Sequence, residues 1–399
     1  MAASIHSSSF AEASEQLQSL GDISLGEKRL ARIAQRVGNE RVAQRQQRLA
    51  AYQAQPIPQQ KIVPPGAPQG LWQNRVAVVY LDGGRVQLRD ERWGQPRAAG
   101  EKKPNWWREP KVAMLATMMS SEQAADPLPA VPECLLNPLW LVPKLNEIKA
   151  AQGGAAAAEQ ARGSRSEEDV EPGHGKLAGP QNWSPPHVVR TVVGTLEPYD
   201  HLGQLAKVEA YHRGFTAATR KAFVADGLPH NWTVQQKYFG DYTPIADLMH
   251  ALSYVYQAAK ASTLEMEECW CCCTAWITLV WQGKIDELIE QIDQQLAAAH
   301  DPAAGEELQA SRRYLANNQE RMRYAEYRRL GLPITTAQME STIKRINRRM
   351  KGTEKFWRPA AEPLLQLCAD DLSETKPLTK YWRDRRQTRT GRRKSRTTR

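Results

Sequence analysis

Three carboxylates occupy positions from which they could act on a substrate. Asp82 follows a run of apolar residues and precedes two glycines, and Asp226 follows a second apolar run and precedes one glycine. Glu340 lies near the start of a strongly basic segment. A single Asp-Gly after a strand is most often only a β-turn. A carboxylate at the carboxyl end of a buried strand, beside glycines that let a ligand approach, also lies where open α/β sheets bind ligands.

Three such acids suit the chemistry of phosphodiester bonds. These bonds can be cut and joined by two metal ions ~3.5–4 Å apart, one activating the attacking hydroxyl and the other stabilising the leaving oxygen. Mg²⁺ prefers oxygen ligands and keeps several waters, so two or three carboxylates suffice without a histidine or cysteine cage. The sequence predicts that Asp82, Asp226 and Glu340 hold two Mg²⁺ or Mn²⁺ ions, with Asp82 as the bridging ligand.

The segment around Glu340 is predicted to form an amphipathic helix. Its buried stripe is formed by four apolar residues at helical spacing, Met339, Ile343, Ile346 and Met350. Glu340 lies on the adjacent face, so it could hold a metal while neighbouring cations hold phosphates. The cations predicted to contact DNA are Lys344, Arg345, Arg348, Arg349 and Lys351. A Glu–Lys pair on a solvated helix, worth about 0.2–0.5 kcal/mol, fits the same spacing.

Asp247 and His250 form a second acidic motif. They stand three residues apart where a short strand runs into a helix, and therefore face the same way. One interpretation is that they contact the metal ligands and hold them in place without binding the metal themselves. The other is a structural Asp cap with a partly buried histidine. Asp247 also closes a short strand, which makes it the alternative to Asp226 as second metal ligand.

The elements that would position these acids alternate between strands and helices. Strands are predicted at residues 76–81, 85–89, 111–117, 188–196, 222–225 and 244–247, with a tight Gly-Gly turn between the first two. Helices are predicted at residues 203–212 and 248–260, throughout a helical block that ends near residue 330, and at residues 337–351. The pattern indicates an α/β fold with a mixed sheet, in which one antiparallel hairpin has parallel neighbours.

The segments around this core differ in composition. Residues 1–55 are predicted to be helical, and their basic second helix fits either a helix-turn-helix or two amphipathic helices of a small bundle. Residues 56–72 are a Pro/Gly-rich linker, and residues 121–187 are a low-complexity insertion. The cluster at residues 269–273 holds four cysteines, which one helix cannot arrange as a tetrahedral zinc site, so buried packing is favoured. Trp232 is expected either to pack in the core or to stack on an unpaired base.

The charge of the chain is concentrated at one end. The formal charge is +10, and residues 383–399 hold nine basic residues against one acid, which leaves +2 for the rest. This tail has almost no apolar residues, so it is predicted to be disordered and to add non-specific affinity for DNA. An apolar run long enough to cross a membrane, a secretory signal and a disulfide framework are not found in the sequence. A reducing, cytoplasmic setting with association with the nucleoid is therefore expected.

The ordered motifs resemble those of a known enzyme family. The segments VAVVYLDGGRVQ, KAFVADGLPHNW, TPIADLMHALSYVYQAA and YRRLGLPITTAQMESTIKRINRRMKGTEKFW resemble the bacterial insertion-sequence transposases of the DDE, RNase H-like superfamily, within its Mutator-like branch. The resemblance implies an RNase H-like catalytic core over residues 73–382, with a helical insertion at residues 251–330. It also implies a catalytic set of Asp82, Asp226 and Glu340, with Asp247 and His250 as the accompanying motif. Unlike many relatives, the chain lacks a Cys-rich zinc-binding region at its start.

The resemblance and the acids together predict a DNA transposase. Such an enzyme would cut the ends of an insertion sequence and join them to target DNA in metal-dependent steps, acting as a homo-oligomer on double-stranded DNA without a membrane partner. Two alternatives stay open: a nuclease of the same fold, and an inactive, transposase-derived DNA-binding protein. A basic RNA-binding protein would use the tail alone and leave the three acids unexplained.

Overall fold

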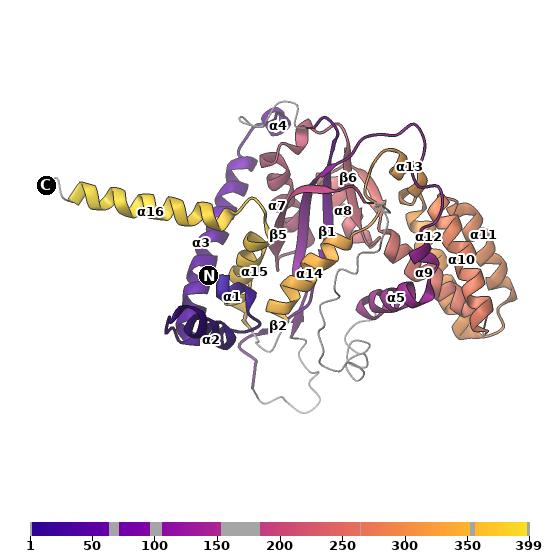
Figure 1. Cartoon of the computed structure of the whole chain (residues 1–399), viewed down its shortest axis with the longest axis horizontal. Helices are drawn as coiled ribbons and strands as arrows, with labels where there is room; N and C mark the ends of the chain where they lie inside the picture. Colours follow the sequence, from indigo (N-terminus) through magenta and orange to yellow (C-terminus); the bar gives the residue numbers. More distant parts are fainter. Residues whose placement is uncertain are drawn as a thin grey trace.

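A five-stranded mixed sheet forms the centre of the protein (Figure 1). The computed structural model describes residues 2–63, 72–95, 106–152, 184–263, 265–351 and 356–396. The strands are β1 (Arg75–Gly83), β4 (Lys111–Met119), β5 (His187–Thr195), β6 (Lys221–Ala225) and β7 (Thr243–Ala246), in the spatial order β5-β4-β1-β6-β7. β4 is antiparallel to β1 and β5, whereas β6 is parallel to β1 and β7. The predicted α/β class with a mixed sheet is therefore confirmed.

The central strands are buried because their sequences are almost continuously apolar. From Val76 to Leu81 every residue of β1 is buried, and the same holds for Val112 to Met118 of β4. Runs of this kind are typical of strands that are covered on both faces. The helices that cover them include α7 (Tyr199–His212) on β4 and β5, α15 (Arg358–Leu372) on β5, and α14 (Ala337–Met350) on β1.

The predicted Gly-Gly hairpin between the first two strands is wrong. β1 pairs with β4 instead, and the chain passes through Gly83 and Gly84 into β2 (Val86–Arg89) without reversing. A tight two-residue hairpin needs positive φ at one or both central residues, and neither Gly83 nor Gly84 has positive φ. β2 belongs to a second sheet, in the order β3-β2-β8, with β3 (Trp107–Arg108) and β8 (Phe356–Trp357).

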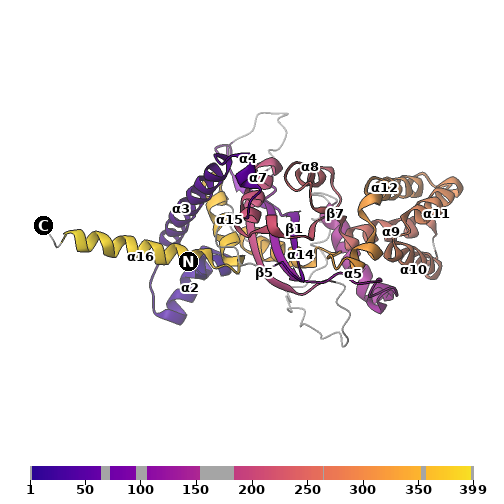
Figure 2. The same ribbon diagram turned by 90° about the horizontal axis from the view of Figure 1, so that it is seen from above.

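A helical block occupies one end of the molecule, beyond β7 (Figures 1 and 2). It contains α9 (Leu248–Ser262), α10 (Met266–Gln282), α11 (Ile285–Ala298), α12 (Pro302–Asn318) and α13 (Tyr324–Arg329), with the 3-10 turn η4 (Gln319–Arg321). A helical block between the last strand of the sheet and the final acid was predicted, and it is present.

The predicted low-complexity insertion at residues 121–187 is corrected in its first part. Residues 121–152 contain the 3-10 turn η1 (Glu133–Leu136) and α5 (Pro138–Gln152), which packs against α9. Leu135, Leu141 and Leu145 are fully buried there, so apolar residues hold this part of the segment against the core. The high content of Pro, Ala and Gly in the segment as a whole made these leucines easy to overlook in the sequence. Residues 153–183 lie outside the described part of the chain, and β5 begins at His187.

The opposite end of the molecule is formed by helices from both ends of the sequence (Figure 2). α1 (Ala2–His6), α2 (Phe10–Gly21) and α3 (Glu27–Gln53) precede α4 (Ile57–Gln60), a single turn in the predicted linker, of which residues 64–71 are not described. α3 packs along α15, where the Nε atom of Arg41 donates to Asp370 at 2.7 Å and Arg45 pairs with Glu362 at 2.7 Å. The 27-residue length and buried inner face of α3 favour a packed helix over the recognition helix of a helix-turn-helix.

The prediction of a disordered tail from residue 383 is also corrected. α16 (Pro377–Arg396) continues through residues 383–396. Its first half is held because Tyr381 and Arg385 both donate to Glu40 of α3, and arginine is itself a good helix former. The last three residues, 397–399, lie outside the described part. None of the described helices is both long and apolar enough to span a membrane.

Candidate active site at the ends of three parallel strands

Three aspartates lie at one level across three neighbouring parallel strands. Tyr80 of β1 is paired with Val224 of β6, so Asp82 and Asp226, each two residues further on, are at the same level. Ala225 is paired with Ala246 of β7, which brings Asp226 and Asp247 to the same level. The carboxyl ends of parallel strands meet at one edge of a sheet, so acids more than a hundred residues apart in sequence come together there.

Asp82 is partly buried and lies among other acids. Burial raises the pKa of Asp82 to about 7, and the negative charges of Asp226 and Glu340 act in the same direction. The charge of His250 and the N–H group of Gly83, which donates to Oδ1 at 2.7 Å, oppose this shift. A carboxyl whose ionised form is disfavoured in this way would gain from a nearby cation.

Asp226 is held by the loop that follows β6. Its Oδ1 atom accepts hydrogen bonds from the backbone of Leu228 at 3.1 Å and from the side chain of Asn231 at 2.7 Å. Gly227 has a φ of +91°, and a Cβ there would lie 2.7 Å from the hydroxyl of Tyr314. Glycine is therefore required at this turn, and the carboxylate is fixed by its neighbours.

Asp247 and His250 form a buried pair that joins two helices. The Oδ2 atom of Asp247 accepts from the backbone N of His250 at 2.9 Å and lies 2.7 Å from its Nδ1, while Oδ1 accepts from the backbone N of Thr336 at 2.6 Å. Thr336 precedes α14, so Asp247 caps α9 and also fixes the start of the helix that carries Glu340. Both of its oxygens are already engaged, which favours Asp226 over Asp247 as a ligand.

His250 supplies positive charge among these acids. Burial alone would lower the pKa of His250, but the hydrogen bond to Asp247 and the charges of Asp247, Asp226 and Asp82 raise it to about 9. At neutral pH the imidazole is therefore protonated. It offsets part of the repulsion that three aspartates at one strand edge would otherwise exert on each other.

Glu340 reaches the same edge from α14. Burial and the charge of Asp247 raise the pKa of Glu340, while His250 and Lys344 act in the opposite direction. Glu147 of α5 also raises it, and Glu147 itself lies 3.4 Å from Lys344. The structure thus brings all three predicted acids, together with Asp247 and His250, within range of each other's charges. The roles of ligand and support remain predictions.

The donor set fits Mg²⁺ or Mn²⁺ by its chemistry, because it consists of carboxylate oxygens. Among the described residues, no group of three or more His, Cys, Asp and Glu side chains is close enough together to hold a metal ion as it stands. The acids are therefore neighbours without forming a closed cage. To bind an ion, the carboxylate side chains at the strand ends and on α14 would have to rotate toward each other.

Of the predicted DNA contacts on α14, Arg349 is wrongly assigned. Its side chain is 1% exposed, its Nε atom donates to the carbonyl of Ser4 at 2.8 Å, and its guanidinium lies 4.4 Å from the ring of Phe10. It therefore anchors α1 and α2 and does not face a ligand. Lys344, Arg345, Arg348 and Lys351 are exposed, as a DNA contact requires. The buried stripe of Met339, Ile343, Ile346 and Met350 is confirmed.

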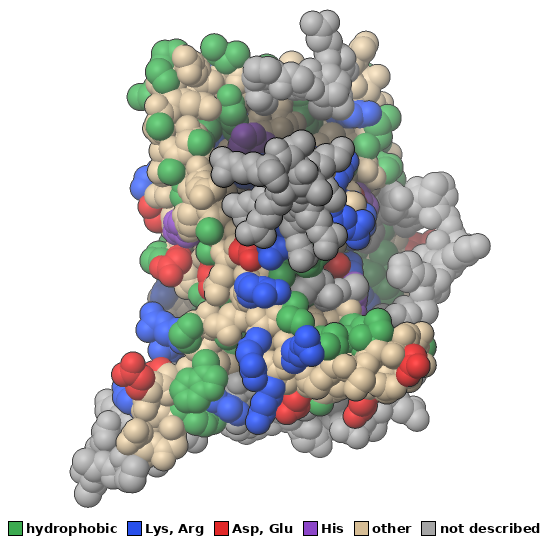
Figure 3. Space-filling view, turned by 90° about the vertical axis from the view of Figure 1, so that its left-hand side faces the viewer, with side chains coloured by type: hydrophobic (Ala, Val, Ile, Leu, Met, Phe, Trp, Pro, Cys, Tyr) green, Lys and Arg blue, Asp and Glu red, His purple; other side chains and the backbone are tan. Residues whose placement is uncertain are grey.

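A second cationic face lies on α3. The helix carries exposed cations near its start, Lys28, Arg29, Arg32 and Arg36. Within the described residues none of the four has an acidic partner at ion-pair distance. Figure 3, which views the side of α2, α3 and α16, shows Lys and Arg side chains gathered over the middle and lower part of this face.

Several residues of the site were missed by sequence reasoning. Tyr314 of α12 donates to the backbone carbonyl of Asp226 at 2.9 Å and stacks on Tyr254 at 3.8 Å. No local pattern links it to Asp226, which is 88 residues away. Asn231 lies in the same DGLPHN segment as Asp226, and a polar residue in the first turn after an Asp-Gly could have indicated it. Trp232 is 7% exposed and donates to Asn318 at 2.8 Å, which supports the core-packing interpretation.

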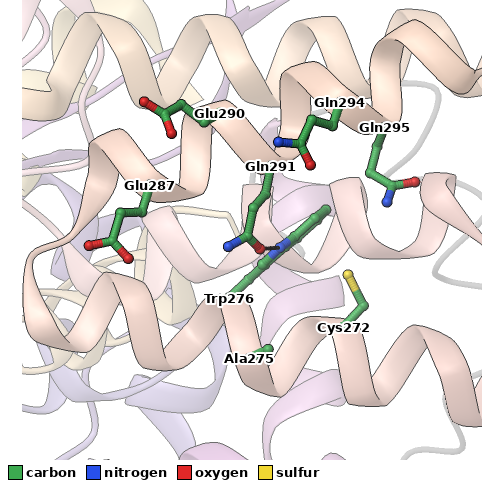
Figure 4. Close-up of a pocket in the computed structure, with 8 residues that line it drawn as sticks. All are labelled: Cys272, Ala275, Trp276, Glu287, Glu290, Gln291, Gln294 and Gln295. Atoms are coloured by element: carbon green, nitrogen blue, oxygen red, sulfur yellow. Dashed lines mark hydrogen bonds between the residues drawn. The ribbon is translucent and has the colours of Figure 1, made fainter.

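A cavity of about 580 Å³ lies elsewhere, between α10 and α11 (Figure 4). The indole of Trp276 donates to Gln291 across it at 2.8 Å, and Cys272 points toward it. Burial raises the pKa of the Cys272 thiol to about 11 and that of Cys273 still further. Among the four clustered cysteines, Cys273 is buried, Cys269 and Cys272 are half-buried and Cys271 is exposed, so the predicted buried packing holds for Cys273 and not for Cys271.

Comparisons with known proteins add no assignment. No protein-family model matches the chain, and no curated protein matches it either. The arguments for a function therefore come from the structure: the three aspartates at one level of the sheet, the effect of the acids on each other's pKa, and the positions of the exposed cations.

Proposed function

We propose that the chain is a DNA transposase of the DDE type, with an RNase H-like core that cuts the ends of an insertion sequence and joins them to target DNA. The observation that carries this proposal is the common level of Asp82 and Asp226 at the ends of neighbouring parallel strands, with Glu340 coupled to them from α14. The strand order β5-β4-β1-β6-β7, with β4 alone reversed, supports an RNase H-like core, as does the helical block before Glu340.

Asp82, Asp226 and Glu340 are the residues that would hold two Mg²⁺ ions. Bound there, the ions would make a water or a 3′-hydroxyl nucleophilic and stabilise the leaving oxygen. The chain itself positions the acids: β1 and β6 fix two of them, and Asp247 fixes the start of α14, which carries the third. His250 lies beside them with a positive charge that favours an approaching phosphate.

The exposed cations of α3 and α14 suit the same substrate. Phosphate contacts by Lys and Arg hold and orient DNA, while they carry little information about sequence. α14 carries Glu340 in its first turn and continues through Lys344, Arg345 and Arg348, so a DNA strand at the acids can be held along the same helix.

The test uses a supercoiled plasmid that carries the DNA flanking the gene on both sides. With Mg²⁺ or Mn²⁺ the purified protein should cut at fixed flanking positions and join the freed 3′ ends to other DNA. Asp82→Asn, Asp226→Asn and Glu340→Gln should each lower both reactions by roughly 10³-fold or more, because each removes a ligand of the site. Asp241→Asn is the matched control, since Asp241 is an exposed acid near the start of β6, paired with Lys221 at 2.6 Å.

The outcomes separate the alternative functions. Cutting without joining would indicate a nuclease of the same fold, and DNA binding without cutting would indicate an inactive derivative. If Asp247→Asn abolished cutting while Asp226→Asn kept part of it, the two aspartates would exchange roles. Normal turnover by Asp82→Asn would refute the proposed site.

A further inference from the structure

An aromatic and cationic surface lies beyond Asp82, on the small sheet that continues from β1 and β4. We call it the tryptophan–arginine surface, and it consists of Arg85, Arg89, Trp93, Trp106, Trp107 and Trp357. Trp357 is 52% exposed, and the other three indoles are half-buried. None of these residues belongs to the carboxylate site or to the cationic faces of α3 and α14.

The indoles and guanidinium groups alternate on this surface. Arg85 lies over Trp107 at 5.6 Å and Arg89 lies over Trp93 at 5.3 Å. The rings of Trp93 and Trp106 meet edge to face, with their centroids 5.1 Å apart. Arg89 is paired across the sheet with Trp357, which brings the fourth indole next to this group.

The surface is tied to the catalytic acids by the backbone. Gly84 donates to the carbonyl of Pro110 at 2.9 Å, and the N–H of Arg85 donates to the side chain of Asn347 at 3.3 Å. Asn347 lies on α14, two turns after Glu340. At about 3.3 Å per residue, Arg85 lies at most roughly 10 Å from Asp82 along the strand and Arg89 at most roughly 23 Å.

We propose that the tryptophan–arginine surface binds unpaired nucleotides of the DNA strand next to the bond that is cut. This inference rests on the proposed function, because it assigns a place to the substrate of that reaction. Every base presents a flat π-face, so stacking on indoles holds single strands without regard to sequence, and arginines beside the rings contact the backbone.

The chemistry favours a single strand over a duplex. Bases inside a duplex are stacked on each other and present only their edges, so half-exposed indoles add little to duplex binding. The exposed cations of α3 and α14 already offer contacts for duplex phosphates. A small sheet of this size could also be stabilised by aliphatic residues alone, without arginines placed over the ring faces.

The experiment measures binding of a labelled 12-nucleotide oligo-dT and of a 12-base-pair duplex by fluorescence anisotropy. It uses the full chain with Asp82→Asn in EDTA, so that no cleavage interferes. Adding Trp107→Ala and Trp357→Ala should weaken oligo-dT binding roughly tenfold or more, since two stacking platforms are lost. Duplex binding should change less than about twofold. Trp107→Phe keeps a ring and should retain most of the affinity.

Trp382→Ala is the matched control, because Trp382 is a half-buried indole on α16 that packs on Tyr381 at 5.0 Å. It should leave oligo-dT binding unchanged. Thermal melting verifies folding, and if Trp107→Ala unfolds the chain, Trp357→Ala and Trp107→Phe decide the question. Unchanged oligo-dT binding, or equal losses for both DNAs, would overturn the inference. A change of oligomeric state without a change in DNA binding would assign the surface to a second copy of the chain.

A failure of this inference can be told apart from a failure of the proposed function. With catalytically intact protein, a substrate with unpaired nucleotides at the cut end should be cleaved faster than a blunt duplex, and Trp107→Ala with Trp357→Ala should remove that preference. If wild-type protein cuts but shows no preference, only the surface is wrongly assigned. If it does not cut and yet binds oligo-dT through the tryptophans, the transposase proposal fails and the surface stands.

Discussion

α14 and α3 have similar basic sequences but use their cations differently. In α14, Arg349 is buried against the first two helices and Lys344 pairs with Glu147 at 3.4 Å. In α3, Arg41 and Arg45 pair with acids of α15, while four cations nearer the start of the helix remain exposed. The count of basic residues in a helix therefore does not tell which of them can contact phosphates. Which helix face is covered by neighbouring elements decides it.

The largest expected effect comes from the buried cation. Arg349→Ala removes hydrogen bonds to the carbonyls of Ser4 and Ser8 and the contact with Phe10, and should lower the free energy of unfolding by about 3 kcal/mol. Arg348→Ala, one residue earlier and exposed, should change it by less than about 0.5 kcal/mol. Urea unfolding measures both. Equal effects would remove the distinction between buried and exposed cations on α14.

The next effect concerns the exposed cations of α3. Replacing Lys28, Arg32 and Arg36 by alanine should weaken binding to any duplex at least about tenfold and lower the slope of log K against log[salt] by about 2 to 3, since each phosphate contact contributes ~0.9. A salt titration measures the slope. Neutralising Lys284, Arg312 and Arg323 in the helical block removes the same charge far from this face and should leave the slope nearly unchanged.

A smaller effect on the melting temperature should distinguish Glu340, in the first turn of α14, from Glu27, in the first turn of α3. Because the pKa of Glu340 is raised, the folded chain keeps that proton to higher pH than the unfolded chain does, so stability is lost as pH rises from the unfolded value to the folded one. Glu340→Gln should therefore raise the melting temperature in metal-free buffer at pH 8, with the gain shrinking toward pH 4. Glu27→Gln, on an exposed turn of α3, should give no such gain. A gain that grew toward low pH would contradict the burial of Glu340.

The smallest effect comes from the exposed ion pair on α14. Glu147→Gln releases Lys344 for DNA and should strengthen duplex binding only about twofold, since exposed pairs are worth about 0.2–1 kcal/mol. Glu307→Gln, which frees Lys149 on the same α5 helix, is the control and should have no effect on DNA binding. Weaker binding by Glu147→Gln would mean that the pair orders α5 for DNA and does not compete with it.

The sequence carried enough information to locate the central strands and the acids at their ends, because both depend on local patterns. Continuous apolar runs predicted five of the central strands within a few residues, and each candidate aspartate was recognised at the end of such a run. The common level of Asp82 and Asp226 follows once β1 and β6 are parallel neighbours. Their roles in metal binding remain predictions.

What the sequence did not give depends on distant contacts. Arg349 donates hydrogen bonds to the carbonyls of Ser4 and Ser8, which lie more than 300 positions earlier in the sequence. α16 is ordered beyond residue 383 because Glu40 of α3 receives Tyr381 and Arg385. The Gly-Gly segment after Asp82 looked like a turn, but the pairing of β1 with β4 leaves it extended. Local composition contains none of these relations.

The contact of α3 with α15 has a consequence for how the protein is made. The charge of Arg41 is paired with that of Asp370, which is synthesised 329 residues later. At roughly 5–20 residues per second, a ribosome needs roughly 15–65 s to supply it. During that interval α3 can pack only on α1, α2 and later α7, so the face of α3 that meets α15 stays uncovered. Glu340 is also synthesised late, so the predicted metal site can be complete only after most of the chain has left the ribosome.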